Sequence, residues 1–115
     1  MGRRGAGAPR PLRGARLIFR RERFGELVRR QLDLFAEDEA ALLREAEAAE
    51  RSYDGAERDA AEEAYGDFQL VLESVAERLE ELRDTYAATL EPEPAEEYEL
   101  AFARAVRKRF PRVRV

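Results

Sequence analysis

The side chains with the greatest scope for chemistry in this chain are carboxylates and guanidiniums, because it contains no histidine and no cysteine. The commonest general base, the commonest transition-metal ligand and the thiol nucleophile are therefore all missing. Four acids can gather where predicted helices meet, and together they would suit Mg²⁺, Ca²⁺ or Mn²⁺: Asp38, Glu45, Asp67 and Glu73. Acids spread along charged helices also follow from composition alone, and we favour that interpretation. The sequence thus predicts a non-enzymatic protein with no metal site and no cofactor.

Arginine is concentrated at the two ends of the chain. Residues 1–23 carry a net charge of +7 and residues 100–115 carry +6, whereas residues 24–99 carry −17. One interpretation is that the ends contact nucleic-acid phosphates or an anionic membrane surface. The candidate contacts would be Arg3, Arg4, Arg10, Arg13, Arg16, Arg107, Lys108, Arg109 and Arg112. The alternative, which we favour for residues 104–114, is that these cations complement a helix dipole and the chain's own acidic middle.

Residues 1–21 are dominated by Gly, Pro and Arg and show no periodicity, which predicts a flexible basic arm. Its first aromatic residue is Phe19, so base stacking is not built into it. Residues 1–21 are either a phosphate-binding segment or a dispensable tail, including a tail created by a start codon assigned too early. No apolar run approaches the roughly 20 residues that span a bilayer, and no apolar secretory segment follows the basic start. A cytoplasmic protein is therefore the default expectation.

A heptad pattern in residues 56–90 organises the rest of the chain. Its apolar positions alternate in steps of four and three: Ala61, Tyr65, Phe68, Leu72, Val75, Leu79, Leu82 and Tyr86. This spacing is typical of a coiled-coil-like helix that buries one stripe against another helix. Leu72 lies in the middle of the stripe and should be fully buried. Gly66 costs such a helix about 1 kcal/mol, which indicates either a close contact with a partner or a tolerated loss.

A second amphipathic helix is predicted over residues 22–52. Its heptad positions are Phe24, Val28, Gln31, Phe35, Asp38, Leu42, Glu45 and Ala49, and several of them are polar. We interpret Gln31 and Asp38 as residues that fix the register, with Arg78 or a nearby hydroxyl as their partner. Asp54 and Gly55 should form a tight turn, with Gly55 in the left-handed conformation and Asp54 as the cap of the next helix.

A third, shorter helix is predicted from Pro94, a favoured first helical residue, to about Phe110. Pro92 ends the helix before it and Pro111 stops it. Acids in its first turn and bases in its last turn complement the helix dipole. Its apolar stripe consists of Tyr98, Ala101, Phe102, Ala105 and Val106. Residues 111–115 are left as a basic tail.

Together these patterns predict an all-α fold over residues 22–110, a three-helix antiparallel arrangement made of a long hairpin and a shorter third helix. A turn at residues 54–55 would place Phe35 opposite Val75 and Leu42 opposite Phe68. The third helix is long enough to cover only about half of the hairpin. The alanine-rich half near the turn should therefore remain as two uncovered helices.

The leading functional hypothesis is a small helical interaction or scaffold protein that acts through its heptad face. The predicted interface consists of Tyr65, Gly66, Phe68, Leu72, Val75, Leu79, Leu82 and Tyr86. Its partner would be another protein or a second copy, since two half-covered hairpins can pair into a four-helix bundle. The alternative is a nucleic-acid-binding accessory protein that uses the basic N- and C-terminal segments, with an affinity that falls steeply with salt.

Overall fold

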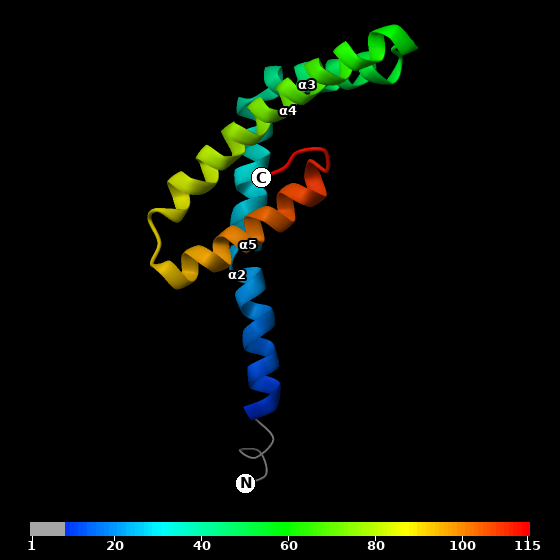
Figure 1. Cartoon of the computed structure of the whole chain (residues 1–115). Coiled ribbons are helices and arrows are strands. Elements are labelled where there is room, and N and C mark those ends of the chain that lie inside the picture. The colour runs from blue at the N-terminus through cyan, green and yellow to red at the C-terminus, as the bar shows by residue number, and fades with distance from the viewer. Residues whose placement is uncertain (1–8) are drawn as a thin grey trace.

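The computed structural model describes the backbone of residues 9–115 and the side chains of residues 23–115. This part of the chain forms four helices and no strand (Figure 1): α2 (Pro9–Asp38), α3 (Ala40–Asp54), α4 (Arg58–Ala87) and α5 (Pro92–Arg109). The predicted all-α class is confirmed. The number of helices differs from the predicted three, because the first predicted helix is divided in two.

The first helix begins at Pro9, whereas the sequence predicted a start near Glu22. Pro9 and Pro11 are compatible with this start because the first N–H groups of a helix have no intrahelical acceptor to lose. The first half of α2 extends away from the other helices (Figure 1). Residues 1–8 lie outside the described part, as do the side chains of Arg10, Arg13 and Arg16.

The division between α2 and α3 is a bend at Glu39. Its backbone dihedrals, φ −106° and ψ 29°, leave the helical region. The hydrogen-bond ladder nevertheless continues through it, with Glu39 N bonded to Phe35 O at 2.8 Å and Leu43 N to Glu39 O at 2.9 Å. The bend lets α2 pack against α5 while α3 packs against α4. One straight helix could not follow both partners, since α4 and α5 diverge from each other (Figure 1).

The α3–α4 hairpin turns where the sequence predicted, but by a different geometry. Gly55 has φ −95° and does not adopt the left-handed conformation. Asp54 is the last residue of α3, and Glu57 takes the position before α4 without a side-chain cap. The predicted left-handed glycine and aspartate cap are therefore wrong. The chain instead changes direction at Glu57, whose backbone is extended, with ψ 168°.

The register of the hairpin also differs from the prediction. Glu39 pairs with Arg78 at 2.8 Å, and the Tyr53 ring contacts the Tyr65 ring at 5.3 Å. These partners lie about two helical turns further along α4 than a tight turn at residues 54–55 would give. The linker of residues 55–57 accounts for part of this displacement.

The last helix, α5, turns back after residues 88–91 and packs across α2 beside the end of α4 (Figure 1). It begins at Pro92 rather than at the predicted Pro94, and Glu91 before it is extended. A proline suits this first position because its missing N–H has no partner there. Its predicted stripe is confirmed: Tyr98, Phe102 and Val106 are buried, and Ala101 and Ala105 pack against them.

The hydrophobic core lies where α2, α4 and α5 meet. It contains Phe24, Val28, Leu32, Phe35, Val75, Leu79, Ala87, Tyr98, Phe102 and Val106. Tyr98 is its centre, since its fully buried ring contacts Phe24 of α2 at 5.7 Å and Tyr86 of α4 at 4.7 Å. Aromatic pairs at these distances add to the stability that burial alone supplies. One side chain of α5 therefore joins all three helices.

Several predicted seam positions lie outside this core. Leu72 is half-buried and is not part of the core cluster, so the prediction that it is fully buried is wrong. Tyr65 is 48% exposed, and Asp38 and Glu45 are exposed. The cause is geometric: no third helix covers this half of the hairpin in the described part of the chain, and there Phe68 is the one buried position of the stripe.

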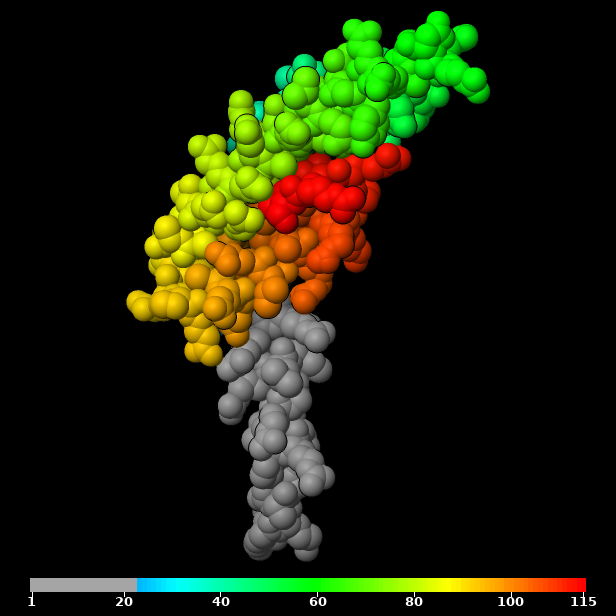
Figure 2. All heavy atoms as spheres, in the orientation of Figure 1, coloured from blue at the N-terminus to red at the C-terminus, as the bar shows by residue number. Residues whose placement is uncertain are grey.

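Residues 110–115, which we call the strap, pack against the rest of the chain. They fold back between α5 and the α3–α4 hairpin (Figure 2). Phe110 packs edge-on against Phe35 at 6.1 Å, and Val113 and Val115 pack against the core. Arg112 pairs with Glu50 of α3 at 3.1 Å. The strap thus fastens the base of the hairpin to the three-helix core.

Candidate interaction surfaces

The heptad face of α4, the predicted interface, is divided between two environments. Phe68, Val75 and Leu79 are buried within the chain and are unavailable to a partner. Leu82 and Tyr86 pack against the core as well. Tyr65 and Leu72, which are seven residues apart and so lie on the same side of the helix, remain partly exposed. In the described part of the chain, Tyr65 and Leu72, which we call the flank, are the positions of the α4 face that stay open to a partner.

We call residues 40–72, α3 with the first half of α4, the arm. Its helix α3 contains no fully buried residue, although Leu42, Leu43, Ala46, Ala49 and Tyr53 are all half-buried. Tyr53 contacts both Tyr65 and Phe68, at 5.3 and 6.3 Å between ring centroids. These contacts hold the two helices together from inside. Apart from Phe68, which is 2% exposed, the apolar side chains of the arm are therefore half-buried or exposed.

Gly66 lies on the exposed side of the arm. A Cβ atom built onto it would meet nothing within 4 Å, so no part of the described chain approaches it closely. Leu70, one helical turn further on, is 63% exposed. The close contact that could explain this glycine is thus not supplied within the chain.

The predicted basic contacts of the C-terminal segment have different roles. Arg109 pairs with Asp33 at 2.5 Å and Arg112 pairs with Glu50 at 3.1 Å. These two arginines meet acids of α2 and α3, as the interpretation of attraction to the acidic middle predicted. Arg107 and Lys108 are exposed and pair with no acid whose side chain is described.

A groove between α2 and α5, which we call the basic groove, has a volume of about 470 Å³. Its lining consists of Gly25, Arg29, Leu32, Ala101, Arg104, Ala105, Lys108 and Arg109. Arg29 was missed by the sequence interpretation because it belongs to the acidic middle of the chain. No local pattern singles it out; only the packing of α5 on α2 brings it opposite Arg104 and Lys108.

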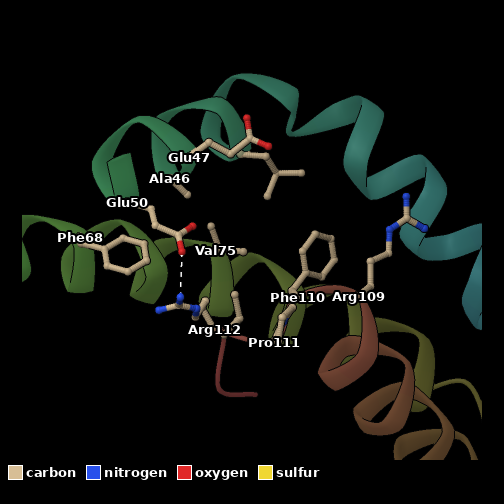
Figure 3. A pocket seen from close by; sticks show the side chains of 11 residues that line it. Ala46, Glu47, Glu50, Phe68, Val75, Arg109, Phe110, Pro111 and Arg112 are labelled. Atoms are coloured by element: carbon tan, nitrogen blue, oxygen red, sulfur yellow. Dashed lines mark ion pairs between the residues drawn. The ribbon is translucent and has the colours of Figure 1, made fainter. Parts of the chain in front are cut away.

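A second hollow of about 330 Å³ lies between the strap and the arm (Figure 3). Phe68 and Val75 of α4 line it from one side and Phe110 and Pro111 from the other. The Arg112–Glu50 ion pair crosses it. Its walls are mainly apolar, and its arginines are already paired with acids. It is a packing gap behind the strap rather than an arrangement suited to catalysis.

The four candidate metal-binding carboxylates are not brought together. Within the described part of the chain, no group of three or more acids is placed to hold a metal ion. Gln31 instead accepts a hydrogen bond from the Tyr98 hydroxyl at 2.9 Å, which confirms the predicted hydroxyl partner. Arg78 is engaged by Glu39. Burial raises the pKa of Tyr98 from 10.0 to about 12, although the bond to Gln31 acts in the opposite direction.

In comparisons with known proteins, no family model, no curated protein and no solved structure matches this chain. Among the residues searched, no helix combines the length and the apolar composition that crossing a bilayer requires. Any function must therefore be argued from the surfaces described above.

Proposed function

We propose that this protein is a small, non-enzymatic helical interaction protein and that its arm receives the partner. The observation that carries this proposal is the uneven enclosure of one heptad stripe. Along α4, Val75 and Leu79 are almost completely buried. Nearer the hairpin turn only Phe68 of the stripe is buried, whereas Leu72 is half-buried and Tyr65 is 48% exposed. A stripe with this spacing is stable when another helix covers it. A cytoplasmic location, expected from the sequence, belongs to the same proposal.

The partner that we propose is a second copy of this chain, because the chain carries a segment of complementary charge. Residues 40–72 have a net charge of −6, and residues 9–23, the first half of α2, have a net charge of +5. Opposite charges on two surfaces steer them together and fix their orientation. A contact between two acidic arms would instead repel.

The two segments also match in length. The α3 helix has 15 residues. At 1.5 Å per residue, it and the first half of α2 are each about 22 Å long. If the arm of each copy takes the first half of α2 from the other, the assembly closes as a twofold dimer. Such a dimer would cover the arm with a third helix, as α5 covers the core.

Sedimentation equilibrium at micromolar concentration tests the proposal. We expect a dimer at low salt that weakens as salt is raised, because screening reduces attraction between exposed opposite charges. A strict monomer, or a dimer that strengthens with salt, would contradict this arrangement.

Two substitutions on α4 locate the interface. Tyr65→Gln removes an apolar side chain from the flank, and Leu70→Gln removes one from the outer face of the same helix. Both side chains are well exposed, at 48% and 63%, so neither change should unfold the monomer. Because the Tyr65 ring also contacts Tyr53, circular dichroism and thermal unfolding of the monomer must first show that Tyr65→Gln keeps the hairpin folded. We expect Tyr65→Gln to weaken the dimer and Leu70→Gln to leave it unchanged. Equal effects would mean that the flank is not the contact surface.

A further inference from the structure

The basic groove brings together three cations that have no acidic partner in the described part of the chain. Arg23, Arg30, Arg78, Arg83, Arg109 and Arg112 all lie within 4.0 Å of an acid. Arg29, Arg104 and Lys108 are exposed, and none of them pairs with an acid whose side chain is described. The remaining cation of the groove, Arg109, is neutralised by Asp33. Three uncompensated positive charges therefore border one space of about 470 Å³.

The shape of the groove follows from the small residues at its base. Gly25 of α2 and Ala101 and Ala105 of α5 leave a shallow channel, and a Cβ atom at Gly25 would meet nothing within 4 Å. Arg104 and Lys108 are four residues apart on α5, so they stand on the same wall about 6 Å apart along the helix. Arg29 stands on the opposite wall, which α2 supplies. The three charges therefore stand on two facing walls of the groove, two on α5 and one on α2.

We propose that the basic groove binds the sugar–phosphate backbone of a single nucleic-acid strand. Arginine and lysine side chains are the usual ligands of phosphate oxygens, and a row of them favours a chain of phosphates. The groove has no aromatic lining residue, so it would contact the backbone without stacking on bases and without reading sequence. Its apolar floor, Leu32 with Ala101 and Ala105, can lie against the sugars.

The sequence next to the groove carries further positive charge. Residues 9–23, which precede Gly25 on α2, have a net charge of +5, and a strand would compete for them with the arm of the second copy in the proposed dimer. Residues 100–115, which supply the other wall, contain no acid. A single inorganic phosphate would leave most of this charge unused, whereas a nucleic-acid strand carries one negative charge per nucleotide. The charge distribution therefore favours a polyanion.

Fluorescence anisotropy with the full-length chain and a labelled 20-nucleotide single strand tests this proposal. Binding should be measured at about 50 and 200 mM salt, the range in which phosphate contacts lose most affinity. We expect binding at the lower concentration and a steep loss at the higher one. Arg104→Gln, or equally Arg29→Gln, should weaken binding roughly fivefold or more and reduce the salt slope by about one phosphate contact.

Arg107→Gln is the matched control, because Arg107 lies on the same helix, is also exposed and does not line the groove. It removes the same charge and should change affinity much less than Arg104→Gln. Equal losses in the two variants would mean that net charge alone attracts the strand, and the groove assignment would be overturned. Far-ultraviolet circular dichroism should show both variants fully folded, since neither side chain is buried.

Three further outcomes would also overturn the proposal. One is an absence of binding to DNA or RNA at the lower salt concentration. Another is unchanged affinity in the triple variant Arg29→Gln/Arg104→Gln/Lys108→Gln, which would assign binding to the N-terminal residues alone. The third is displacement of the bound strand by vesicles containing phosphatidylserine, with a tighter affinity for the vesicles, which would assign the groove to an anionic membrane surface.

Discussion

The three-helix core and the arm are built from the same kinds of helix, yet they enclose their apolar side chains to very different extents. The core buries Val28, Leu79, Tyr98 and Phe102 completely. The arm contributes α3, in which no residue is fully buried. The two regions share α4, which runs from one into the other. An amphipathic pattern alone therefore does not determine burial. How far the apolar stripe of α4 is buried depends on whether a third helix covers it.

The third helix of the core, α5, fills the space between its neighbours because its large apolar side chains lie in one row. Tyr98, Phe102 and Val106 recur every four residues on α5 and fill the space left by the divergence of α2 and α4. The arm has mostly alanines at comparable positions, among them Ala46, Ala49 and Ala64. Small side chains let two helices approach but supply little apolar area for them to bury.

The largest effect should come from truncating a core residue. Leu79→Ala should cost about 2–5 kcal/mol, because Leu79 is completely buried and its loss leaves a cavity. For a domain of this size, that corresponds to a fall in Tm of roughly 10 °C or more. Urea or thermal unfolding measures it.

Leu72→Ala is the matched substitution in the arm, on the same face of the same helix but about two turns away. Leu72 is half-buried and outside the core cluster, so its truncation should cost only about 1 kcal/mol. Both variants replace leucine with alanine within α4, so the side-chain change and the helix propensity are the same in each. If Leu72→Ala is as damaging as Leu79→Ala at concentrations where the protein is monomeric, the distinction between core and arm fails.

Tyr98→Phe tests the polar contact at the centre of the core. It removes the hydroxyl that donates to Gln31 and should cost about 1 kcal/mol near neutral pH. Burial raises the pKa of Tyr98 to about 12, so folding favours the protonated form. The stability linked to this proton is complete below the unfolded pKa near 10 and is lost as pH rises through the folded value. The phenylalanine variant cannot show this loss.

Urea unfolding at about pH 8 and about pH 11 therefore distinguishes the two proteins. At the lower pH the wild type should be more stable than Tyr98→Phe. At the higher pH this advantage should shrink or reverse, because only the wild type must keep a buried tyrosine protonated. A stability difference that is the same at both pH values would show that Tyr98 is not enclosed as the core requires.

The sequence predicted those parts of the fold that depend on local signals. Pro111 correctly marks the end of α5, and the Asp54–Gly55 pair correctly marks a turn. Pro92 lies where two helices are separated, but α4 already ends at Ala87 and Pro92 itself begins α5. The bend at Glu39 was not predictable in this way, because no proline or glycine accompanies it. It arises from packing, since α2 and α3 follow different partners. The fully buried position predicted for Leu72 failed for the same reason: periodicity identifies a stripe but not what covers it.

The candidate surfaces show the same limit. Charge segregation pointed to residues 104–114, but it could not separate Arg109 and Arg112, which pair with acids, from Arg104 and Lys108, which do not. Arg29 belongs to a segment of net charge −17 and carries no local signal. Its place in the basic groove depends on a helix that begins far later in the chain. A surface built from segments far apart in the sequence can be identified only once the fold is known.

The smallest expected effect concerns Gly66, and it distinguishes a free arm from a covered one. Glycine within a helix is less stable than alanine by about 0.5–1 kcal/mol. A Cβ atom at Gly66 meets no atom of this chain within 4 Å, so Gly66→Ala should raise the stability of the monomer by about that amount. Thermal unfolding at low protein concentration measures this gain.

The same variant should then be compared with wild type by sedimentation at micromolar concentration. Because Gly66 is turned about 100° around α4 from Tyr65, and a Cβ atom there meets nothing within 4 Å, the added methyl group should leave a flank-mediated dimer unchanged. A loss of dimer in a monomer that has become more stable would place the partner at Gly66 instead. That result would retain self-association but move the contact about a quarter turn around α4. It would also give this glycine the close approach that the described chain does not supply.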